Sequence, residues 1–143
     1  MNTASQIDTT VLIVGGGPVG MTMALCLAKR GIASYLVELR SAETLPDVKC
    51  NHISSRSMEL FRSLGISQDL RAAGLPDEYP HDVSYRTTTL GEEIARIHIP
   101  GRNTRLTDHS GPDGNWPTPE PPHRINQRYI EPILRRHVQK QTL

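Results

Sequence analysis

Four apolar residues at positions 11–14, followed at once by a glycine-rich turn, constrain the fold of this chain more than any other feature. A run that is apolar at every position predicts a strand buried on both faces, as in a parallel sheet. Gly15, Gly17 and Gly20 then follow at the spacing at which glycine permits a tight turn, a close approach of a pyrophosphate and close packing of the next helix. We therefore predict that residues 11–40 form a βαβ unit that opens an α/β fold.

The residues after the turn have the pattern of a helix. Pro18 suits the first helical turn, where its missing N–H costs nothing. Val19, Met23 and Leu27 recur every four residues and predict the apolar face of this helix, and Ala24, Leu25 and Ala28 add small or apolar packing surface. Gly31 is placed as the cap residue beyond its C-terminus.

A second predicted strand, 34–37, delivers Glu38 to the carboxyl edge of the sheet. Glu38 follows the glycine turn at about the 20-residue offset of a ribose-binding carboxylate. Its oxygens can accept hydrogen bonds from both ribose hydroxyls, and its charge would repel a 2′-phosphate. The spacing therefore predicts a bound adenosine dinucleotide other than NADP. A βαβ opening with a solvated Glu38 is the alternative.

Composition argues against several classes of partner. The chain has 16 Lys plus Arg against 15 Asp plus Glu, a formal net charge of +1, which makes no electrostatic case for nucleic acid or an anionic membrane. No apolar stretch approaches the ~18 residues of a membrane span, and the polar start lacks the features of a signal peptide. Cys26 and Cys50 are interpreted as packing or incidental thiols, so a reducing cytoplasm is the expected compartment. Cys50 and His52 lack further ligands at usable spacing, so we expect no metal site.

A short helix is predicted between residues 53 and 66. Its signals are a Ser54 or Ser55 cap, an apolar face and a terminating glycine, namely Met58, Phe61, Leu64 and Gly65. Arg56 lies in the first turn, where the helix dipole disfavours a cation unless an anion lies nearby. A bound pyrophosphate would supply that anion, and a solvated Arg56 is the alternative.

The remaining chain alternates between strand, loop and helix signals. Period-two alternation at 82–88 and 93–99, with a turn between them, predicts a β-hairpin. A loop rich in Pro and Gly follows at 100–123, and its Trp116 is either a pocket cover or a surface anchor. The last predicted helix spans 124–141 and contains Pro132, which should kink it or mark a late start.

Several of these segments together resemble one protein family. The similar segments are the glycine turn, Glu38, Ser-Arg-Ser-Met-Glu at 55–59, Leu-Gly-Ile at 64–66, Gly-Glu-Glu at 91–93 and the run 127–134. In these segments the chain resembles the FAD-dependent aromatic hydroxylases, which are flavoprotein monooxygenases of the p-hydroxybenzoate and phenol hydroxylase type. The resemblance implies a Rossmann-like FAD-binding fold with an added β-hairpin, incomplete relative to the family. It implies a nucleotide-binding part at 1–80, the start of a substrate-facing region at 81–123, and a returning helix at 124–143.

The resemblance also implies a chemistry. FAD would be the bound cofactor, NAD(P)H the transient reductant, and a small phenolic or aromatic molecule and O2 the substrates. The catalytic residues stay unknown, because the later family motifs have no counterpart within residues 1–143, and a homo-oligomer stays open. We expect the isolated chain to be marginally folded and inactive. A non-catalytic FAD-binding fragment and an NAD-dependent dehydrogenase are the alternatives.

The candidate site residues follow from the motifs and from the resemblance. By resemblance, Arg124 and Gln127 lie where the family uses polar side chains against the flavin nucleotide, and helix-entry residues in solvent are the alternative. The candidate cofactor contacts are Gly15, Gly17, Pro18, Val19, Gly20, Glu38, Arg40, Arg56, Arg124 and Gln127.

Overall fold

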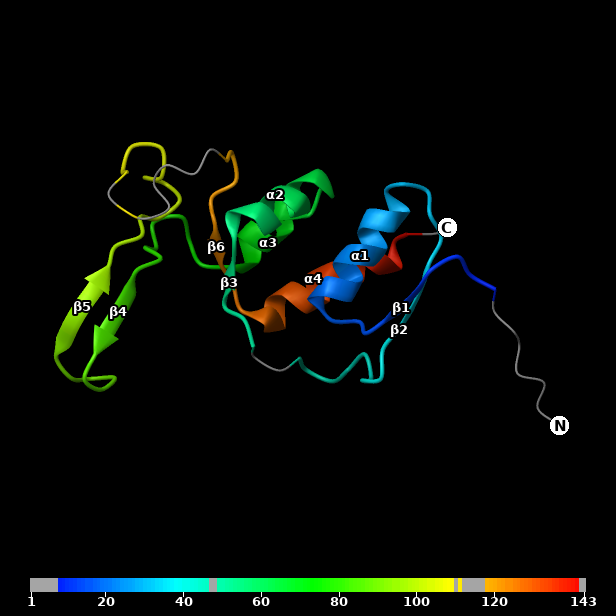
Figure 1. Ribbon diagram of the computed structural model, residues 1–143, viewed down its shortest axis with the longest axis horizontal. Helices are drawn as coiled ribbons and strands as arrows, with labels where there is room; N and C mark the ends of the chain where they lie inside the picture. The colour runs from blue at the N-terminus through cyan, green and yellow to red at the C-terminus, as the bar shows by residue number, and fades with distance from the viewer. Residues whose placement is uncertain (1–7, 47–48, 110, 112–117, 142–143) are drawn as a thin grey trace. The chain divides into compact units, whose positions relative to one another are not determined.

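A computed structural model describes residues 8–46, 49–109, 111 and 118–141, and the chain divides into two compact units (Figure 1). The first unit combines residues 1–49 with 127–143, and the second contains residues 50–126. The first unit holds β1 (Leu12–Val14), α1 (Pro18–Ala28), β2 (Tyr35–Val37) and α4 (Gln127–Gln139). The second holds β3 (His52–Ile53), α2 (Ser55–Ser63), α3 (Ser67–Ala73), β4 (Val83–Arg86), β5 (Glu93–Ile97) and β6 (His123–Arg124).

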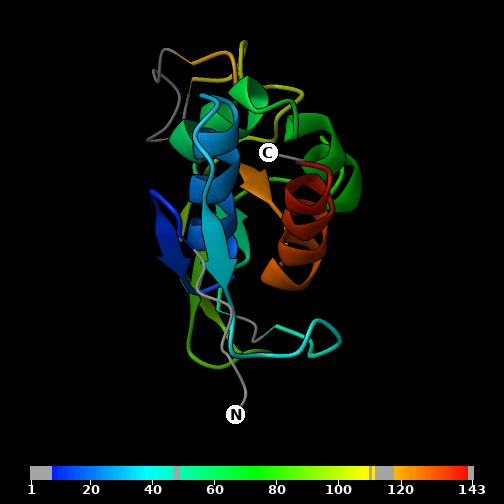
Figure 2. The same ribbon diagram turned by 90° about the vertical axis from the view of Figure 1, so that its right-hand side faces the viewer.

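The first unit is built on a parallel pair of strands. β1 pairs with β2 in the register Leu12 with Tyr35 through Val14 with Val37. One residue later the amide of Gly15 donates to the carbonyl of Val37 at 2.8 Å, so the glycine turn begins where the pairing ends. Helix α1 connects the strands, packs against both of them and lies beside α4 in both views (Figure 1, Figure 2). Glu38 therefore emerges at the same edge of the sheet as the glycine turn.

Glycine ends α1 as the sequence predicts. Gly31 has a φ of +70°, a left-handed conformation in which a side chain would be strained. The amide of Ile32 donates to the Leu27 carbonyl at 3.0 Å, and that of Gly31 donates to Ala28 at 2.9 Å. These two bonds form a Schellman motif that satisfies carbonyls at the helix end.

The prediction that the first strand is buried on both faces is wrong for this structure. Leu12 and Val14 are 58% and 81% exposed, and Tyr35 and Val37 beside them are also exposed. Because α1 covers only one face of the two-stranded sheet, alternate side chains on the other face meet no covering layer among the described residues.

The predicted packing surface of α1 is confirmed at Ala24 and Leu25 and is wrong at Val19 and Met23. Val19 and Met23 are exposed, whereas the buried side chains of this helix are Met21, Ala24 and Leu25. Helix α1 is apolar on almost every face, so more than one face shows apolar residues at a spacing of four. The tight approach of Gly20 to β1 decides which stripe faces the strands.

Helix α4 begins later than the sequence predicts. It starts at Gln127 and runs through Pro132, while Arg124 belongs to strand β6. Its buried stripe is Ile130, Glu131, Ile133 and Leu134. Tyr129 is 58% exposed because it precedes that stripe by one position.

The second unit packs α2 and α3 beside a short antiparallel pair of strands. β3 pairs with β6, which brings Ile53 opposite His123. The Ser54 hydroxyl accepts a hydrogen bond from the Ser57 amide at 3.3 Å, which makes Ser54 the cap of α2. Gly65, with a φ of +74°, ends the helix as predicted. The core of this unit consists of Ile53, Met58, Phe61, Ile66, Leu70 and Ile125.

Strands β4 and β5 extend from this unit as an antiparallel pair. Val83 lies opposite Ile97 and Tyr85 opposite Ala95, with a register shift after Tyr85. Every residue of the two strands is exposed, and Arg96 forms ion pairs with Glu93 on its own strand and with Asp82, which directly precedes β4. Trp116 lies outside the described residues. No helix in the described part of the chain is both long and apolar enough to cross a membrane.

Two histidines are buried in the second unit without full hydrogen bonding. His81 and His123 are 4% and 1% exposed, and in the described part of the chain the Nδ1 atom of each has no partner. His123 Nε2 lies 2.9 Å from the carbonyl of Leu70, and the rings of His81 and His52 meet edge to face. Burial, with a smaller effect of the Arg124 guanidinium, lowers the pKa of His81 to about 4. Burial likewise lowers the pKa of His123 to about 4, against the opposing effect of the bond to Leu70.

We expect these histidines to make the protein less stable as the pH falls from about 6.5 to about 4. In that window the unfolded chain binds protons that the folded chain excludes, so the free energy of unfolding decreases by up to about 3 kcal/mol for each histidine. Urea unfolding between pH 7.5 and 4.5 measures this slope, and His81→Gln should reduce it. Carboxylates whose pKa values are lowered in the folded chain, such as Glu93, change the free energy of unfolding at lower pH than the histidines do. A free energy of unfolding that stays constant from pH 7 to 4.5 would contradict the prediction.

Candidate functional site

The glycine turn of the first unit is shaped by two glycines with different tasks. Gly15 has a φ of +110°, which few other residues adopt. A Cβ built on Gly20 would lie 1.9 Å from the carbonyl oxygen of Gly15 and 3.3 Å from the Ile13 side chain. Gly20 is therefore required for α1 to pack against β1.

Gly17 is a different case. It is the N-cap of α1 with φ −74° and ψ −176°, an extended conformation open to any residue, and a Cβ built on it would meet nothing within 4 Å. Neither backbone strain nor packing within the chain explains a glycine here. A group bound at the turn would occupy the open space beside Gly17.

The N-terminus of α1 has no acceptor of its own. Among the described residues no side chain caps it, Pro18 occupies its first position, and its first turn carries no acidic residue. Amide N–H groups in the first turn of a helix lack intrahelical partners and form the positive end of the helix dipole. The turn is therefore suited to a bound anion such as a phosphate.

Glu38 is held against this turn by three hydrogen bonds. Its Oε2 accepts from the Gly16 amide at 2.6 Å, and its Oε1 accepts from the Arg40 amide at 2.9 Å and from Arg40 Nε at 3.1 Å. The bonds from the amide and side chain of Arg40, with that from Gly16, lower the pKa of Glu38 to about 2. Its carboxylate is therefore ionised at neutral pH, and its side chain remains 22% exposed.

Arg40 joins Glu38 to a second carboxylate on α4. Arg40 Nη2 lies 3.4 Å from Oε2 of Glu131, and Gln127 Nε2 donates to Oε1 of Glu131 at 2.7 Å. Glu131 is 1% exposed, while the Arg40 side chain is 36% exposed. The hydrogen bond to Glu38, and then the charge of Glu131, raise the pKa of Arg40. Glu38, Arg40, Glu131 and Gln127 thus form one network, which we call the Arg40 network.

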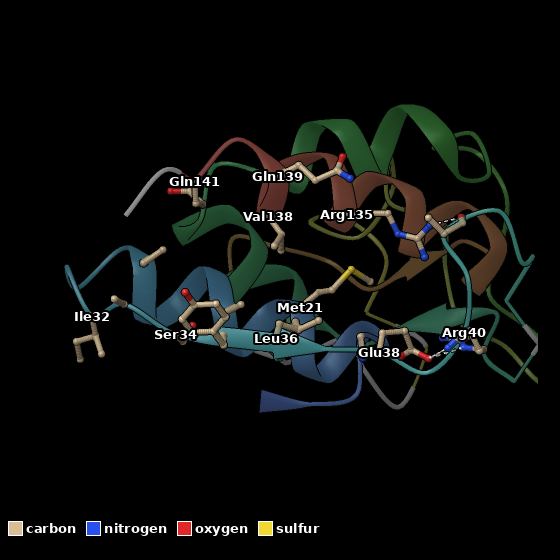
Figure 3. Close-up of a pocket in the computed structure, with 16 residues that line it drawn as sticks. Met21, Ile32, Ser34, Leu36, Glu38, Arg40, Arg135, Val138, Gln139 and Gln141 are labelled. Atoms are coloured by element: carbon tan, nitrogen blue, oxygen red, sulfur yellow. Dashed lines mark hydrogen bonds and ion pairs between the residues drawn. The ribbon is translucent and has the colours of Figure 1, made fainter. Parts of the chain in front are cut away.

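A cavity of about 520 Å³ lies beside the Arg40 network in the first unit. Its walls come from α1, β2 and α4, with Met21, Leu36 and Val138 among its apolar residues. In Figure 3, Glu38 and Arg40 lie at one end of this cavity, and Ile32 and Gln141 lie at the other. Arg135 also lines it and donates to the Ala42 carbonyl. The charged end and the apolar walls suit a ligand that is polar at one end and flat or apolar at the other.

The other two candidate residues lie in the second unit. Arg56 is 87% exposed in the first turn of α2 and pairs with Glu59 at 3.8 Å. Arg124 donates from Nη2 to the carbonyl of His81 at 2.8 Å, so part of its guanidinium serves the fold. The structure thus gathers the glycine turn, Glu38, Arg40 and Gln127 in one unit, and it places Arg56 and Arg124 in the other.

Sequence reasoning missed two members of this site. Gly16 was read only as part of the turn, although its amide binds Glu38. Glu131 was not singled out, although it is a carboxylate on the apolar stripe of α4, four residues after Gln127. That placement is a usable signal, because a charged side chain is almost never fully buried unless it is paired. Across residues 8–46, 49–109, 111 and 118–141, no cluster of three or more His, Cys, Asp or Glu residues could hold a metal ion.

Comparison with known proteins places these features in context. Residues 8–143 match the family model described as FAD binding domain. The chain is 36% identical over 139 residues to the FAD-dependent monooxygenase apdD of Emericella nidulans, which covers 94% of this chain and 22% of that protein. It is 32% identical over 135 residues to the phenol 2-monooxygenase of Pseudomonas sp. (strain EST1001), covering 93% of this chain and 21% of that protein.

Solved structures agree with these relatives. The rebeccamycin biosynthetic enzyme RebC with reduced flavin superimposes with a TM-score of 0.79 at 36% identity, over 96% of this chain and 25% of that one. The flavin-dependent monooxygenase PieE, in complex with FAD and substrate, superimposes with a TM-score of 0.77 at 32% identity, over 96% of this chain and 23% of that one. The chain thus spans about a fifth of the length of the curated relatives and about a quarter of these structures.

Proposed function

Because the chain belongs to the FAD binding domain family, we propose that it holds the adenosine and pyrophosphate of FAD in an NAD(P)H-dependent monooxygenase that hydroxylates a phenolic or related aromatic ring. The relative named phenol 2-monooxygenase supports the phenolic substrate class. The observation that carries the proposal is the ionised Glu38, held by the Gly16 amide at the edge of a turn that is open beside Gly17.

The residues of the first unit fit the nucleotide part of FAD. The open space beside Gly17 admits a pyrophosphate, and the first-turn amides of α1 can donate to it. Glu38 can accept a hydrogen bond from a ribose hydroxyl at Oε2, which accepts only from the Gly16 amide, whereas Oε1 already accepts two hydrogen bonds from Arg40. When bound, FAD supplies the redox chemistry, taking up reducing equivalents from NAD(P)H and activating O2 for insertion into the ring.

The first test of the proposal is flavin binding by the purified protein. Titration with FAD, followed by flavin fluorescence and visible absorbance, should give saturable binding at one site. Competition by ADP-ribose would show that the adenosine and pyrophosphate half is recognised. Binding of NADH in preference to FAD would favour the dehydrogenase alternative, and binding of neither nucleotide would overturn the proposed function.

We expect Glu38→Ala to weaken FAD binding by more than about tenfold, because a hydrogen bond from a ribose hydroxyl to a charged acceptor is lost. Glu38→Gln keeps the shape and one acceptor oxygen, so it should lose less. Fluorescence titration of both variants beside the unchanged protein measures the difference. Equal FAD affinity for all three proteins would remove Glu38 from the binding site.

The helix-dipole argument and the resemblance both make Arg56 a candidate cofactor contact, and Arg56→Ala tests that assignment. We expect a clear loss of FAD affinity and a shallower dependence of that affinity on salt, as when a cation that faces a phosphate is removed. Arg62→Ala is a matched control, because Arg62 is exposed on the same helix and pairs with Glu120. If Arg56→Ala and Arg62→Ala bind FAD alike at low and high salt, Arg56 is a solvated helix residue.

A further inference from the structure

Glu131 is a buried charge whose partners all belong to the first unit. Its side chain is 1% exposed, and its two oxygens are divided between Gln127 Nε2 and Arg40 Nη2. Burying a carboxylate costs several kcal/mol unless it is paired and hydrogen-bonded. An apolar residue at position 131 would continue the stripe of Ile130, Ile133 and Leu134 without that cost. The packing of α4 therefore gives no reason for a carboxylate here.

Arg40 is the link between this buried charge and the surface. Its Nε binds Glu38 at 3.1 Å and its Nη2 faces Glu131 at 3.4 Å, so the two carboxylates engage two different nitrogens of one guanidinium. The planar fork of an arginine can span two carboxylates in this way, whereas a lysine presents a single point charge. Glu131 thus limits the orientations open to Arg40, and Arg40 limits those open to Glu38.

The charges also bear on which nucleotide can bind. Arg40 and Arg135 are the arginines that line the cavity beside Glu38, and Arg135 is engaged by the Ala42 carbonyl. An arginine close to the ribose carboxylate is the residue type that accommodates a 2′-phosphate in NADP-binding folds. Here one guanidinium is shared by two carboxylates, so Glu38, Glu131 and Arg40 together carry a net negative charge, and two nitrogens of Arg40 are engaged by carboxylates and not by a phosphate.

We propose that Glu131 is the positioning residue of the ribose site: by holding Arg40 from the side of α4, it fixes Glu38 for the ribose hydroxyls and denies Arg40 to a 2′-phosphate. This inference rests on the proposed function, since it assigns Glu131 a role in nucleotide selectivity. Glu131 itself makes no contact with the nucleotide and acts through Arg40.

The test compares ADP-ribose with 2′-phospho-ADP-ribose, two ligands that differ only in the 2′-phosphate. We expect the unchanged protein to prefer ADP-ribose. Glu131→Gln should narrow that preference by roughly fivefold, since a contact within a charged network is removed and Arg40 is released. A matched control is Glu43→Gln, which removes one carboxylate from an exposed position of the same unit that binds only Ser41 in the described structure. The control should leave the preference unchanged.

A double-mutant cycle separates positioning from simple packing. If Glu131 acts through Arg40, then adding Glu131→Gln to Arg40→Gln should change neither the affinity for ADP-ribose nor the preference between the two ligands. The double variant is expected to fold even where Arg40→Gln does not, because Glu131 is then no longer a buried charge without its partner. Thermal unfolding of each variant monitors the fold.

The outcomes distinguish this inference from the function on which it rests. If the unchanged protein binds neither FAD nor ADP-ribose, the proposed function fails. If the unchanged protein binds ADP-ribose but Glu131→Gln keeps its preference over 2′-phospho-ADP-ribose, the role of Glu131 is overturned. The same follows if the double variant differs from Arg40→Gln in either measurement.

Discussion

Gly17→Val should strongly weaken FAD binding while the protein stays folded. Residue 17 has an extended backbone that valine adopts readily, and a Cβ there meets nothing within 4 Å. The added branched side chain would instead fill the open space beside the turn, where we propose that the pyrophosphate lies. We expect the affinity for FAD to fall by about a hundredfold or more, which corresponds to the upper range of overpacking costs.

Thermal unfolding measured beside the FAD titration makes this prediction specific. Valine is a poorer N-cap than glycine, so we expect a loss of stability of at most about 1 kcal/mol. Gly17→Ala adds a smaller group and should lose an intermediate amount of affinity. A Gly17→Val protein that binds FAD as tightly as the unchanged protein would show that this glycine serves only the turn.

Gly20→Ala should mainly lower the stability of the protein, whereas Gly17→Val should mainly lower its affinity for FAD. The new Cβ would lie 1.9 Å from the Gly15 oxygen and 3.1 Å from the Gly15 carbonyl carbon, and both atoms belong to the backbone. Alanine gains about 1 kcal/mol over glycine in a helix, but α1 could accept the methyl group only by moving away from β1. We expect a net loss of about 2 kcal/mol or more, because overpacking against a backbone that cannot yield exceeds the gain in propensity.

Urea unfolding of Gly20→Ala beside Gly17→Ala measures this difference within one turn. The second variant places the same methyl group three residues away in open space. FAD binding by Gly20→Ala should fall only as far as the displaced helix disturbs the turn. Equal free energies of unfolding for the two variants would mean that Gly20 is not required for the packing of α1 on β1.

Local chemistry explains which parts of the fold the sequence could predict. The cap at Gly31 and the Ser54 cap of α2 depend on a few neighbouring residues, and both predictions are confirmed. The family resemblance is likewise confirmed by the match over residues 8–143. The two cap predictions are correct because the backbone conformation at a turn or a helix end suits only a few residue types.

Burial could not be predicted in the same way, because it depends on neighbours that are distant in the sequence. The pattern of β1 is apolar at every position, yet one face of the sheet is exposed in this chain. Helix α1 offers several apolar stripes, and only its approach to β1 selects Met21 and Leu25. The Arg40 network joins residues 91 positions apart, which no local period links. The assignments of Arg56 and Arg124 to the cofactor stay predictions.

The hydrogen bond from the Gly15 amide to the Val37 carbonyl affects where residues can be inserted between the glycine turn and Glu38 without moving the carboxylate. It ties the turn to the end of β2 directly, so the distance between turn and carboxylate is independent of the number of residues in between. Extra residues in the connection from Gly31 to Ser34 should leave Glu38 in place. One extra residue between Val37 and Glu38 would instead turn the carboxylate to the opposite face of the strand. In comparable chains, the carboxylate that corresponds to Glu38 is therefore better located by counting one residue beyond the second strand than by counting from the glycines.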